Sequence, residues 1–269
     1  MTALQPVLDA LYHYPVKSMA GRRLDKAWLT LQGLPHDRCW MIADVRGRFV
    51  TGREYPELVR VQAIPAADGL TLSVAGRSTL YVPNSAFDRP ADATVWGDAF
   101  PAWEGAAEAD AWISAFIGAP LKLLWTGVHT TRRVHSENQV PLSFADGFPL
   151  LLIGQASLDD LCARIGRPLS MARFRPNLVI NGAPPYAEDR WTRIRIGDAV
   201  LRIVKPCERC VFTTVDPETG SRGLDQEPLR TLAAYRRTPA GAIFGQNVIA
   251  DTEAEIVPGM PVEVLEARE

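Results

Sequence analysis

The sequence is poor in cysteine and histidine, and this scarcity limits the metal and redox chemistry that it can carry. Its 269 residues include four cysteines and four histidines. Four cysteines in so long a chain do not make a disulfide framework, so we expect reduced thiols. A zinc ribbon needs two close pairs of ligands, whereas Cys39 and Cys162 are each isolated among apolar neighbours. One close pair remains, Cys207 and Cys210.

The sequence also lacks an excess of charge, a long apolar run and a nucleotide fingerprint. It has 29 basic and 31 acidic residues, whereas nucleic-acid-binding proteins usually carry a basic excess. The longest strongly apolar run covers only residues 149–153, far short of the roughly 20 residues that span a membrane. Residues 1–8 show neither region of a signal peptide. We therefore expect a cytoplasmic protein with neither a nucleic-acid nor a membrane partner. No GxGxxG motif is present.

Short strands separated by turn signals dominate the chain. Helical segments are expected at residues 107–117, from Ser157 as N-cap to Gly166 and at residues 227–236, with a further short one at residues 171–174. Strands and helices do not alternate regularly, which argues against a doubly wound sheet. We predict a mainly β (α+β) chain with a few peripheral helices: an N-terminal β-barrel-like domain, residues 1–126, and a second β-barrel domain, residues 127–269. Expected strands include residues 7–14, 26–31, 39–43, 58–64 and 211–215.

The clearest local structure is a hairpin that leads directly to the cysteine pair. Residues 193–196 and 199–204 flank Gly197-Asp198, which suits a two-residue turn. The sequence then reads Cys207-Glu208-Arg209-Cys210. A thioredoxin-type pair has a helix at this point, whereas a β-branched run, residues 211–215, follows here. A single CxxC pair is a weak signal, so a purely structural pair stays open beside a thiolate that binds a soft metal.

Other residues of chemical interest are donors suited to a phosphate or another anion. They lie where strands end or turns begin, and they are Lys17, Ser18, Arg38, Arg53, Arg175 and Asn177. A soft ligand among anion donors suggests a metal carried by a phosphorylated organic cofactor. Periodicity cannot show whether residues so far apart in the chain converge.

Several stretches resemble the MOSC proteins, a family named for the C-terminal domain of molybdenum cofactor sulfurase. Residues 11–18, Gly33-Leu34 and residues 37–41 resemble its N-terminal β-barrel domain. The stretches that resemble the MOSC domain itself are residues 174–177, 197–198, 207–210, 213–220 and 244–247. Within the family, the sequence is similar to the amidoxime-reducing components of mitochondria and their bacterial relatives.

The resemblance implies a molybdenum cofactor, Mo-molybdopterin, with Cys210 as the thiolate ligand of the metal. It places Lys17, Ser18, Arg38, Arg175 and Asn177 on positions that hold the pterin and its phosphate, with Arg53 as a further candidate. Cys207 falls on a position that does not bind the metal. Arg209 and Asp216 flank the ligand and are candidates for tuning it. Residues 146–149 depart from the family's pattern of small hydroxyl residues near the cofactor.

The implied activity is reduction of N-hydroxylated compounds, namely hydroxylamines, amidoximes and N-hydroxylated bases. The sequence has no cysteine set typical of a ferredoxin, so we expect electrons from a separate flavoprotein reductase or ferredoxin-type donor. The alternative is a protein that binds or carries the molybdenum cofactor or sulfur.

Overall fold

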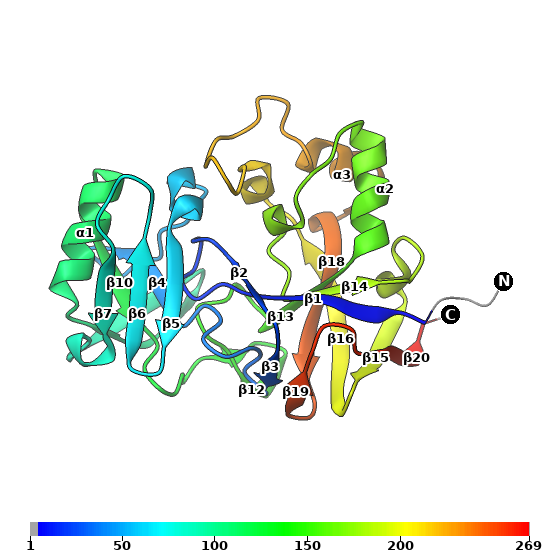
Figure 1. Cartoon of the computed structure of the whole chain (residues 1–269), viewed down its shortest axis with the longest axis horizontal. Helices are drawn as coiled ribbons and strands as arrows, with labels where there is room; N and C mark the ends of the chain where they lie inside the picture. The colour runs from blue at the N-terminus through cyan, green and yellow to red at the C-terminus, as the bar shows by residue number, and fades with distance from the viewer. Residues whose placement is uncertain (1–4, 269) are drawn as a thin grey trace.

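The largest sheet joins strands from both ends of the chain. In the computed structural model, which describes residues 5–268, this sheet has nine strands and runs between the edge strands β2 and β20 (Figure 1). Its order is β2 (Arg22–Leu24), β1 (Val7–His13), β14 (Leu178–Asn181), β13 (Leu150–Gly154), β18 (Gly241–Ala250), β16 (Ala199–Glu208), β15 (Trp191–Ile196) and β20 (Val262–Ala267), and β17 (Arg237–Thr238) also pairs with β18. The strand order is thus an open path and not a closed ring.

The remaining strands form smaller sheets, most of them in the N-terminal half. Four strands pair in the order β4 (Trp40–Asp44), β10 (Leu121–Trp125), β9 (Asp98–Glu104) and β8 (Arg89–Val95). Three more are β5 (Gln62–Ala66), β6 (Gly69–Ser73) and β7 (Leu80–Pro83). The two-stranded pairs are β11 (Arg133–Val134) with β12 (Glu137–Pro141), and β3 (Ala27–Leu29) with β19 (Ala254–Ile256). The predicted mainly β fold is confirmed.

Three α-helices of the described chain lie at the periphery, as predicted. They are α1 (Ala107–Ile117), α2 (Gln155–Ile165) and α3 (Leu229–Tyr235), with α1 in the N-terminal part and the other two in the C-terminal part (Figure 1). Five 3₁₀ turns add to them: η1 (Pro56–Arg60), η2 (Asn84–Ala86), η3 (Met171–Arg173), η4 (Ala187–Asp189) and η5 (Val211–Thr214). Among the described residues, no helix is long and apolar enough to cross a membrane.

Three local predictions are wrong. Residues 211–215 do not form a strand, because the Thr213 amide and hydroxyl both bond the Cys210 carbonyl and close the turn η5. The expected strand at residues 58–64 begins as η1, since Pro56 at its start favours a helical turn. Helix α2 has Gly154 as its N-cap, and Ser157 lies inside it because its hydroxyl bonds the buried Glu188 carboxylate instead.

The hairpin β15–β16 matches its prediction and carries the chain to the cysteines. Ile196 pairs with Ala199 across Gly197-Asp198, and Gly197 adopts a left-handed φ of 58° that glycine tolerates without strain. Strand β16 extends beyond the expected residue 204, through Cys207, because its last residues still pair with β18. One cysteine is thereby placed on a sheet and the other beyond its end.

Two segments of the first thirty residues belong to sheets of the C-terminal half. Strand β1 pairs with β14 in antiparallel register, with Leu11 opposite Leu178, and β3 pairs with β19. Leu8, Leu11 and Leu29 are fully buried in the same core as residues of β13 to β20. The division of the chain near residue 127 stays a prediction. This pairing brings Lys17 and Ser18, which follow β1, next to the C-terminal half.

His13, the last residue of β1, makes the stability of the fold sensitive to acid. Its side chain is buried, and Nδ1 donates to the Pro35 carbonyl at 3.1 Å. Burial lowers the pKa of His13 below its usual 6.5. The unfolded state therefore binds the proton more readily than the folded state, and stability is lost as the pH falls below about 6.5.

We expect His13→Phe to reduce this pH dependence. The free energy of unfolding should fall less between about pH 7.5 and pH 5.5 in this variant than in the wild type, because the titrating group is gone. Urea unfolding at both pH values measures the difference, with the exposed His129→Phe as the matched control. Equal falls in all three proteins would show that His13 does not couple folding to pH.

Candidate functional site

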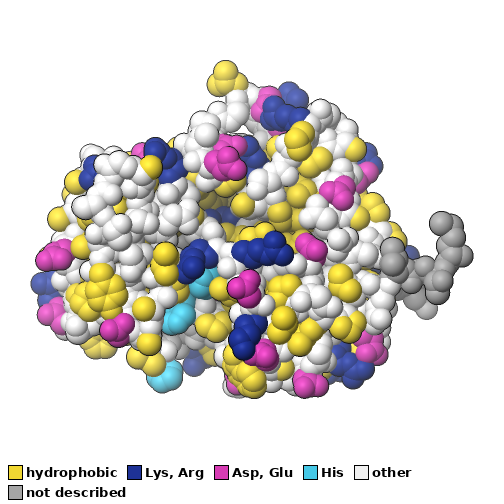
Figure 2. Space-filling model, in the orientation of Figure 1, with side chains coloured by type: hydrophobic (Ala, Val, Ile, Leu, Met, Phe, Trp, Pro, Cys, Tyr) yellow, Lys and Arg dark blue, Asp and Glu magenta, His cyan; other side chains and the backbone are white. Residues whose placement is uncertain are grey.

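The site is a cavity between the N-terminal and C-terminal parts, where the surface is hollowed (Figure 2). Every residue predicted to hold a cofactor lines it, together with both residues of the CxxC pair and Arg209. These residues are Lys17, Ser18, Arg38, Arg53, Arg175, Asn177, Cys207, Arg209 and Cys210. Asp216 lies outside this wall. Residues from five separate stretches of the chain thus converge on one place.

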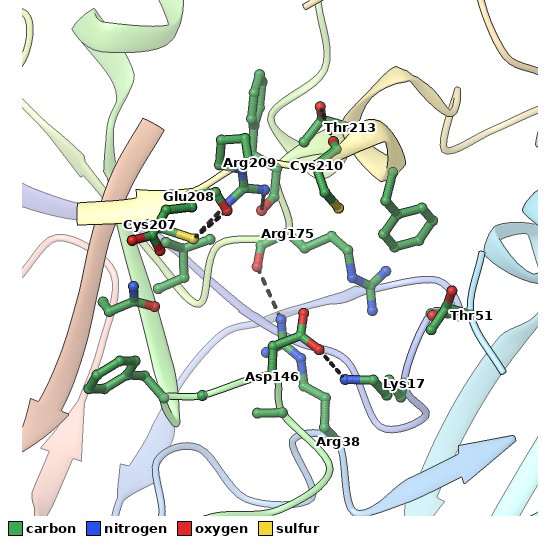
Figure 3. Close-up of a pocket in the computed structure, with 18 of the residues that line it drawn as sticks. Lys17, Arg38, Thr51, Asp146, Arg175, Cys207, Glu208, Arg209, Cys210 and Thr213 are labelled. Carbon is green, nitrogen blue, oxygen red and sulfur yellow. Dashed lines mark hydrogen bonds and ion pairs between the residues drawn. The ribbon is translucent and has the colours of Figure 1, made fainter. Parts of the chain in front are cut away.

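The two cysteines occupy different environments within the cavity. Cys207 lies in β16, and its sulfur accepts a hydrogen bond from Arg209 Nη1 at 3.1 Å (Figure 3). Burial raises the pKa of the Cys207 thiol, although the Arg209 guanidinium opposes that effect. Cys210 is exposed and lies just before η5. The neutral form of Cys207 is favoured, whereas Cys210 offers an accessible sulfur.

A network of buried bonds holds Arg38 at the cavity. Its Nη1 donates to Asp37 Oδ2 at 2.5 Å and to Asn177 Oδ1 at 3.1 Å, and its Nη2 donates to the Arg175 carbonyl at 3.2 Å. Asn177 also donates to Asp37 and to the Tyr12 carbonyl and accepts from the Leu151 amide. The Asn177 amide is therefore fully bonded within the protein, and what it does here is position Arg38 and Asp37.

Arg175 is the most unusual charged group of the site. Nη1 donates to the Met19 carbonyl at 2.6 Å, while Nη2 is buried without a partner among residues 5–268. Burial lowers the pKa of Arg175 to about 10, and the neighbouring Arg38 charge adds to this. No carboxylate forms an ion pair with Arg175 in the part of the chain that the structure describes. A buried donor without a partner is costly, and a bound anion would satisfy it.

Three of the predicted residues have strained backbones. Ser18, Arg38 and Arg175 adopt φ values of 71°, 50° and 57°, a left-handed region that residues other than glycine seldom occupy. Strain of this kind costs about 1–3 kcal/mol per residue and gathers at functional sites, where the surrounding structure maintains it. All three of these side chains line the cavity.

Lys17 is paired within the protein by the loop that departs from the family pattern. Its ammonium donates to Asp146 Oδ1 at 2.6 Å and to the Phe144 carbonyl at 2.8 Å (Figure 3). Burial lowers the pKa of Lys17, and Asp146 acts in the opposite direction. The Asp146 carboxylate therefore neutralises part of the positive charge that Lys17 would present to a bound anion.

Positive charge nevertheless exceeds negative charge around the cavity. Six cationic side chains line it, namely Lys17, Arg38, Arg53, Arg173, Arg175 and Arg209, against the carboxylates of Asp146 and Glu208. Asp37 and Asp216 lie behind the wall and pair with Arg38 and Arg173, at 2.5 and 2.6 Å. Six cations against these four carboxylates leave two unbalanced positive charges. The cavity is therefore suited to an anionic ligand such as a phosphate.

Sequence reasoning missed several residues that shape this site. Tyr14 is buried, and its ring lies beneath both guanidinium groups, 4.4 Å from Arg38 Cζ and 4.1 Å from Arg175 Cζ. Gly21 packs against that ring so closely that a Cβ atom would lie 2.2 Å from it. Tyr14 lies three residues before Lys17, within the stretch of residues 11–18 that resembles the family's N-terminal domain, so the sequence did contain a signal for it. Thr213 also lines the cavity and lies in residues 213–220, one of the stretches that resemble the MOSC domain, whereas nothing local indicated Thr51 or Arg173.

Comparisons with known proteins cover both halves of the chain. Residues 5–120 match the MOSC N-terminal beta barrel domain, and residues 139–263 match the MOSC domain. Mitochondrial amidoxime-reducing component 1 of Homo sapiens is 33% identical over 276 residues, covering 95% of this chain and 82% of that protein. Molybdenum cofactor sulfurase of Oryza sativa subsp. japonica is 30% identical, covering 96% of this chain and 34% of that protein. A crystal structure of the YUAD protein of Bacillus subtilis aligns with 97% of this chain and 95% of its own, at 11% identity and a TM-score of 0.46.

Proposed function

Because the chain belongs to the MOSC family, we propose that it is a molybdenum cofactor-dependent oxidoreductase that reduces N-hydroxylated compounds. The observation that carries the proposal is the cavity itself, which an exposed thiol, Cys210, lines together with cationic donors, and these include Arg175 Nη2, which has no partner among the described residues. The relatives named amidoxime-reducing components support the reaction class.

The donor set of the cavity fits a metal carried by a phosphorylated pterin. Cys210 would supply the soft thiolate that molybdenum accepts. Arg175 and Arg38 would bind the phosphate, since Arg175 Nη2 lacks a partner in residues 5–268 and Arg38 is held beside it. Lys17 and Ser18, which also line the cavity, would make further contacts with the bound cofactor. Arg53, which pairs with no carboxylate among the described residues, would add charge at the mouth.

The bound cofactor would supply the two-electron transfer that removes oxygen from nitrogen, and the chain would supply position, charge and access. Overall, the N-hydroxylated substrate takes two electrons and two protons and leaves as the N–H compound and water. Arg209 would hold the segment from Cys207 to Cys210 in place through its bonds to the Cys207 sulfur and the Phe174 carbonyl, the latter 2.7 Å long. Asp216 would act indirectly, because its carboxylate accepts a hydrogen bond from Arg173 and holds that side chain at the cavity wall.

The electrons would come from a separate flavoprotein reductase or ferredoxin-type protein. The sequence contains no GxGxxG fingerprint for a pyridine nucleotide. We expect no oxidation of NADH or NADPH by the isolated chain and turnover once such a donor protein is added. Absorbance at 340 nm measures this directly. Oxidation of NADH by the pure chain in the presence of substrate would contradict the need for a donor.

Metal content and turnover together test the proposed function. Protein made in a host supplied with molybdate should contain molybdenum by elemental analysis. With a chemical reductant it should convert benzamidoxime or hydroxylamine into the reduced product. Bound molybdenum without turnover on any such substrate would favour the alternative, a carrier or binding protein for the cofactor or for sulfur, which the likeness to a molybdenum cofactor sulfurase supports. Absence of both would leave the cysteine pair with a structural role.

A further inference from the structure

Trp96 is held in a conformation that its own turn does not favour. Val95 pairs with Asp98, so Trp96 and Gly97 are the two loop residues of the β8–β9 hairpin. Trp96 has a φ of 56° whereas Gly97 has no positive φ, and two-residue hairpin turns with a positive φ at the first loop position alone usually place glycine there. Here the glycine comes one position later. A strained tryptophan at a hairpin tip indicates that its side chain is needed where it lies.

The contacts of Trp96 place it on the rim of the cavity. The Arg53 guanidinium carbon lies 4.3 Å from the centre of its ring, and the Phe49 ring centre lies 5.2 Å away. Its indole N–H donates to Asp146 Oδ1 at 3.0 Å. Arg53 and Asp146 both line the cavity. The tryptophan is therefore attached to the cavity wall from two sides.

The same side chain presents a large aromatic surface to solvent. Trp96 is 52% exposed, although burying an indole ring is strongly favourable. Beside it, the Asp146 side chain is 70% exposed and accepts a bond from Lys17 within the cavity. An exposed aromatic face next to a carboxylate suits a flat unsaturated group that carries N–H donors. Neither feature is explained by packing of the fold.

We infer that Trp96 forms a stacking subsite at the rim, which selects N-hydroxylated substrates with an aromatic substituent over those with a saturated substituent. The inference rests on the proposed function for its substrates, but not for the binding surface itself. Stacking on the ring would hold the substrate beside Arg53 and Asp146, which both line the cavity.

The test compares two amidoximes that differ only in the substituent on the amidoxime carbon, which is aromatic in one compound and saturated in the other. We expect Trp96→Gly to lower the preference for benzamidoxime over acetamidoxime about 3- to 10-fold, both in kcat/KM and in Kd by calorimetry, which is the range of one lost stacking contact. Glycine is chosen because it adopts this φ without strain. Trp96→Phe, which keeps a ring, should retain most of the preference. Trp28→Ala is the matched control, because Trp28 is 55% exposed on β3 and does not line the cavity.

The outcomes separate the subsite from the proposed function. An unchanged preference in Trp96→Gly, or an equal change in Trp28→Ala, would overturn the subsite even if both substrates are reduced. Loss of benzamidoxime affinity in Trp96→Gly, in a protein that reduces neither compound, would support the subsite and reject the function. Hydroxylamine turnover without measurable benzamidoxime binding by the wild type would reject the subsite alone.

Discussion

Cys210→Ala is expected to abolish reduction of N-hydroxylated substrates, with a loss of at least about 1,000-fold in turnover. The substitution removes the one protein sulfur proposed to bind molybdenum, and a methyl group cannot replace a thiolate ligand. Stability should change little, because Cys210 is exposed and the bonds that close η5 use its backbone carbonyl. Molybdenum content, turnover with a chemical reductant and urea unfolding measure the three effects separately.

Cys207→Ala is the matched control, since the two cysteines are three residues apart and share the cavity. We expect a much smaller loss of activity, because this thiol is proposed to bind no metal. Its substitution removes the sulfur that Arg209 Nη1 contacts but leaves the bond from Nη2 to the Phe174 carbonyl. Equal losses in both variants would instead support a mechanism that uses both sulfurs, such as a disulfide cycle. Full activity in Cys210→Ala would reject the metal ligand.

Arg38→Met and Arg175→Met should separate the stability of the fold from the binding of the cofactor. Arg38 neutralises Asp37, whose side chain is 2% exposed. Removing it leaves a buried carboxylate without a counter-charge, at a cost of about 3–5 kcal/mol in the free energy of unfolding. Arg175 pairs with no carboxylate in the described chain, so its removal should cost only about 1 kcal/mol, from the bond to the Met19 carbonyl.

The loss of bound cofactor should follow the opposite order, with the larger loss in Arg175→Met. Arg175→Met removes a buried donor that has no partner within the described part of the chain, so the molybdopterin content of the purified protein should fall at least about tenfold. Asp37→Asn combined with Arg38→Met restores charge balance and should recover much of the lost stability without recovering cofactor. Urea unfolding and quantification of the bound pterin check both expectations. A normal pterin content in Arg175→Met would reject Arg175 as a phosphate ligand.

Local sequence signals correctly predicted those elements whose structure depends on residues within the element itself. The helix at residues 107–117 has its predicted bounds, because it combines acidic residues in its first turn with Gly118 in the left-handed conformation at its end. The hairpin around Gly197-Asp198 formed as its turn residues require. Residues 211–215 misled because β-branched residues favour strands only where a partner strand is available. After Cys210 the chain has left β18, and bonds to the Cys210 carbonyl close a 3₁₀ turn instead.

The residue types of the candidate site could likewise be recognised locally, whereas their convergence depends on contacts between distant segments. Residue types and motif spacing are local properties, so one close cysteine pair and a set of anion donors could be recognised in the sequence alone. The tertiary structure brings these residues together, since β1 pairs with β14 over a separation of more than 160 residues and carries Lys17 and Ser18 to Arg175. It also decided which charges stay free. Asp37 and Asp146 neutralise Arg38 and Lys17, whereas Arg175 keeps a buried donor to which no other described residue bonds. Pairings of this kind depend on burial and register between distant segments, which no local pattern encodes.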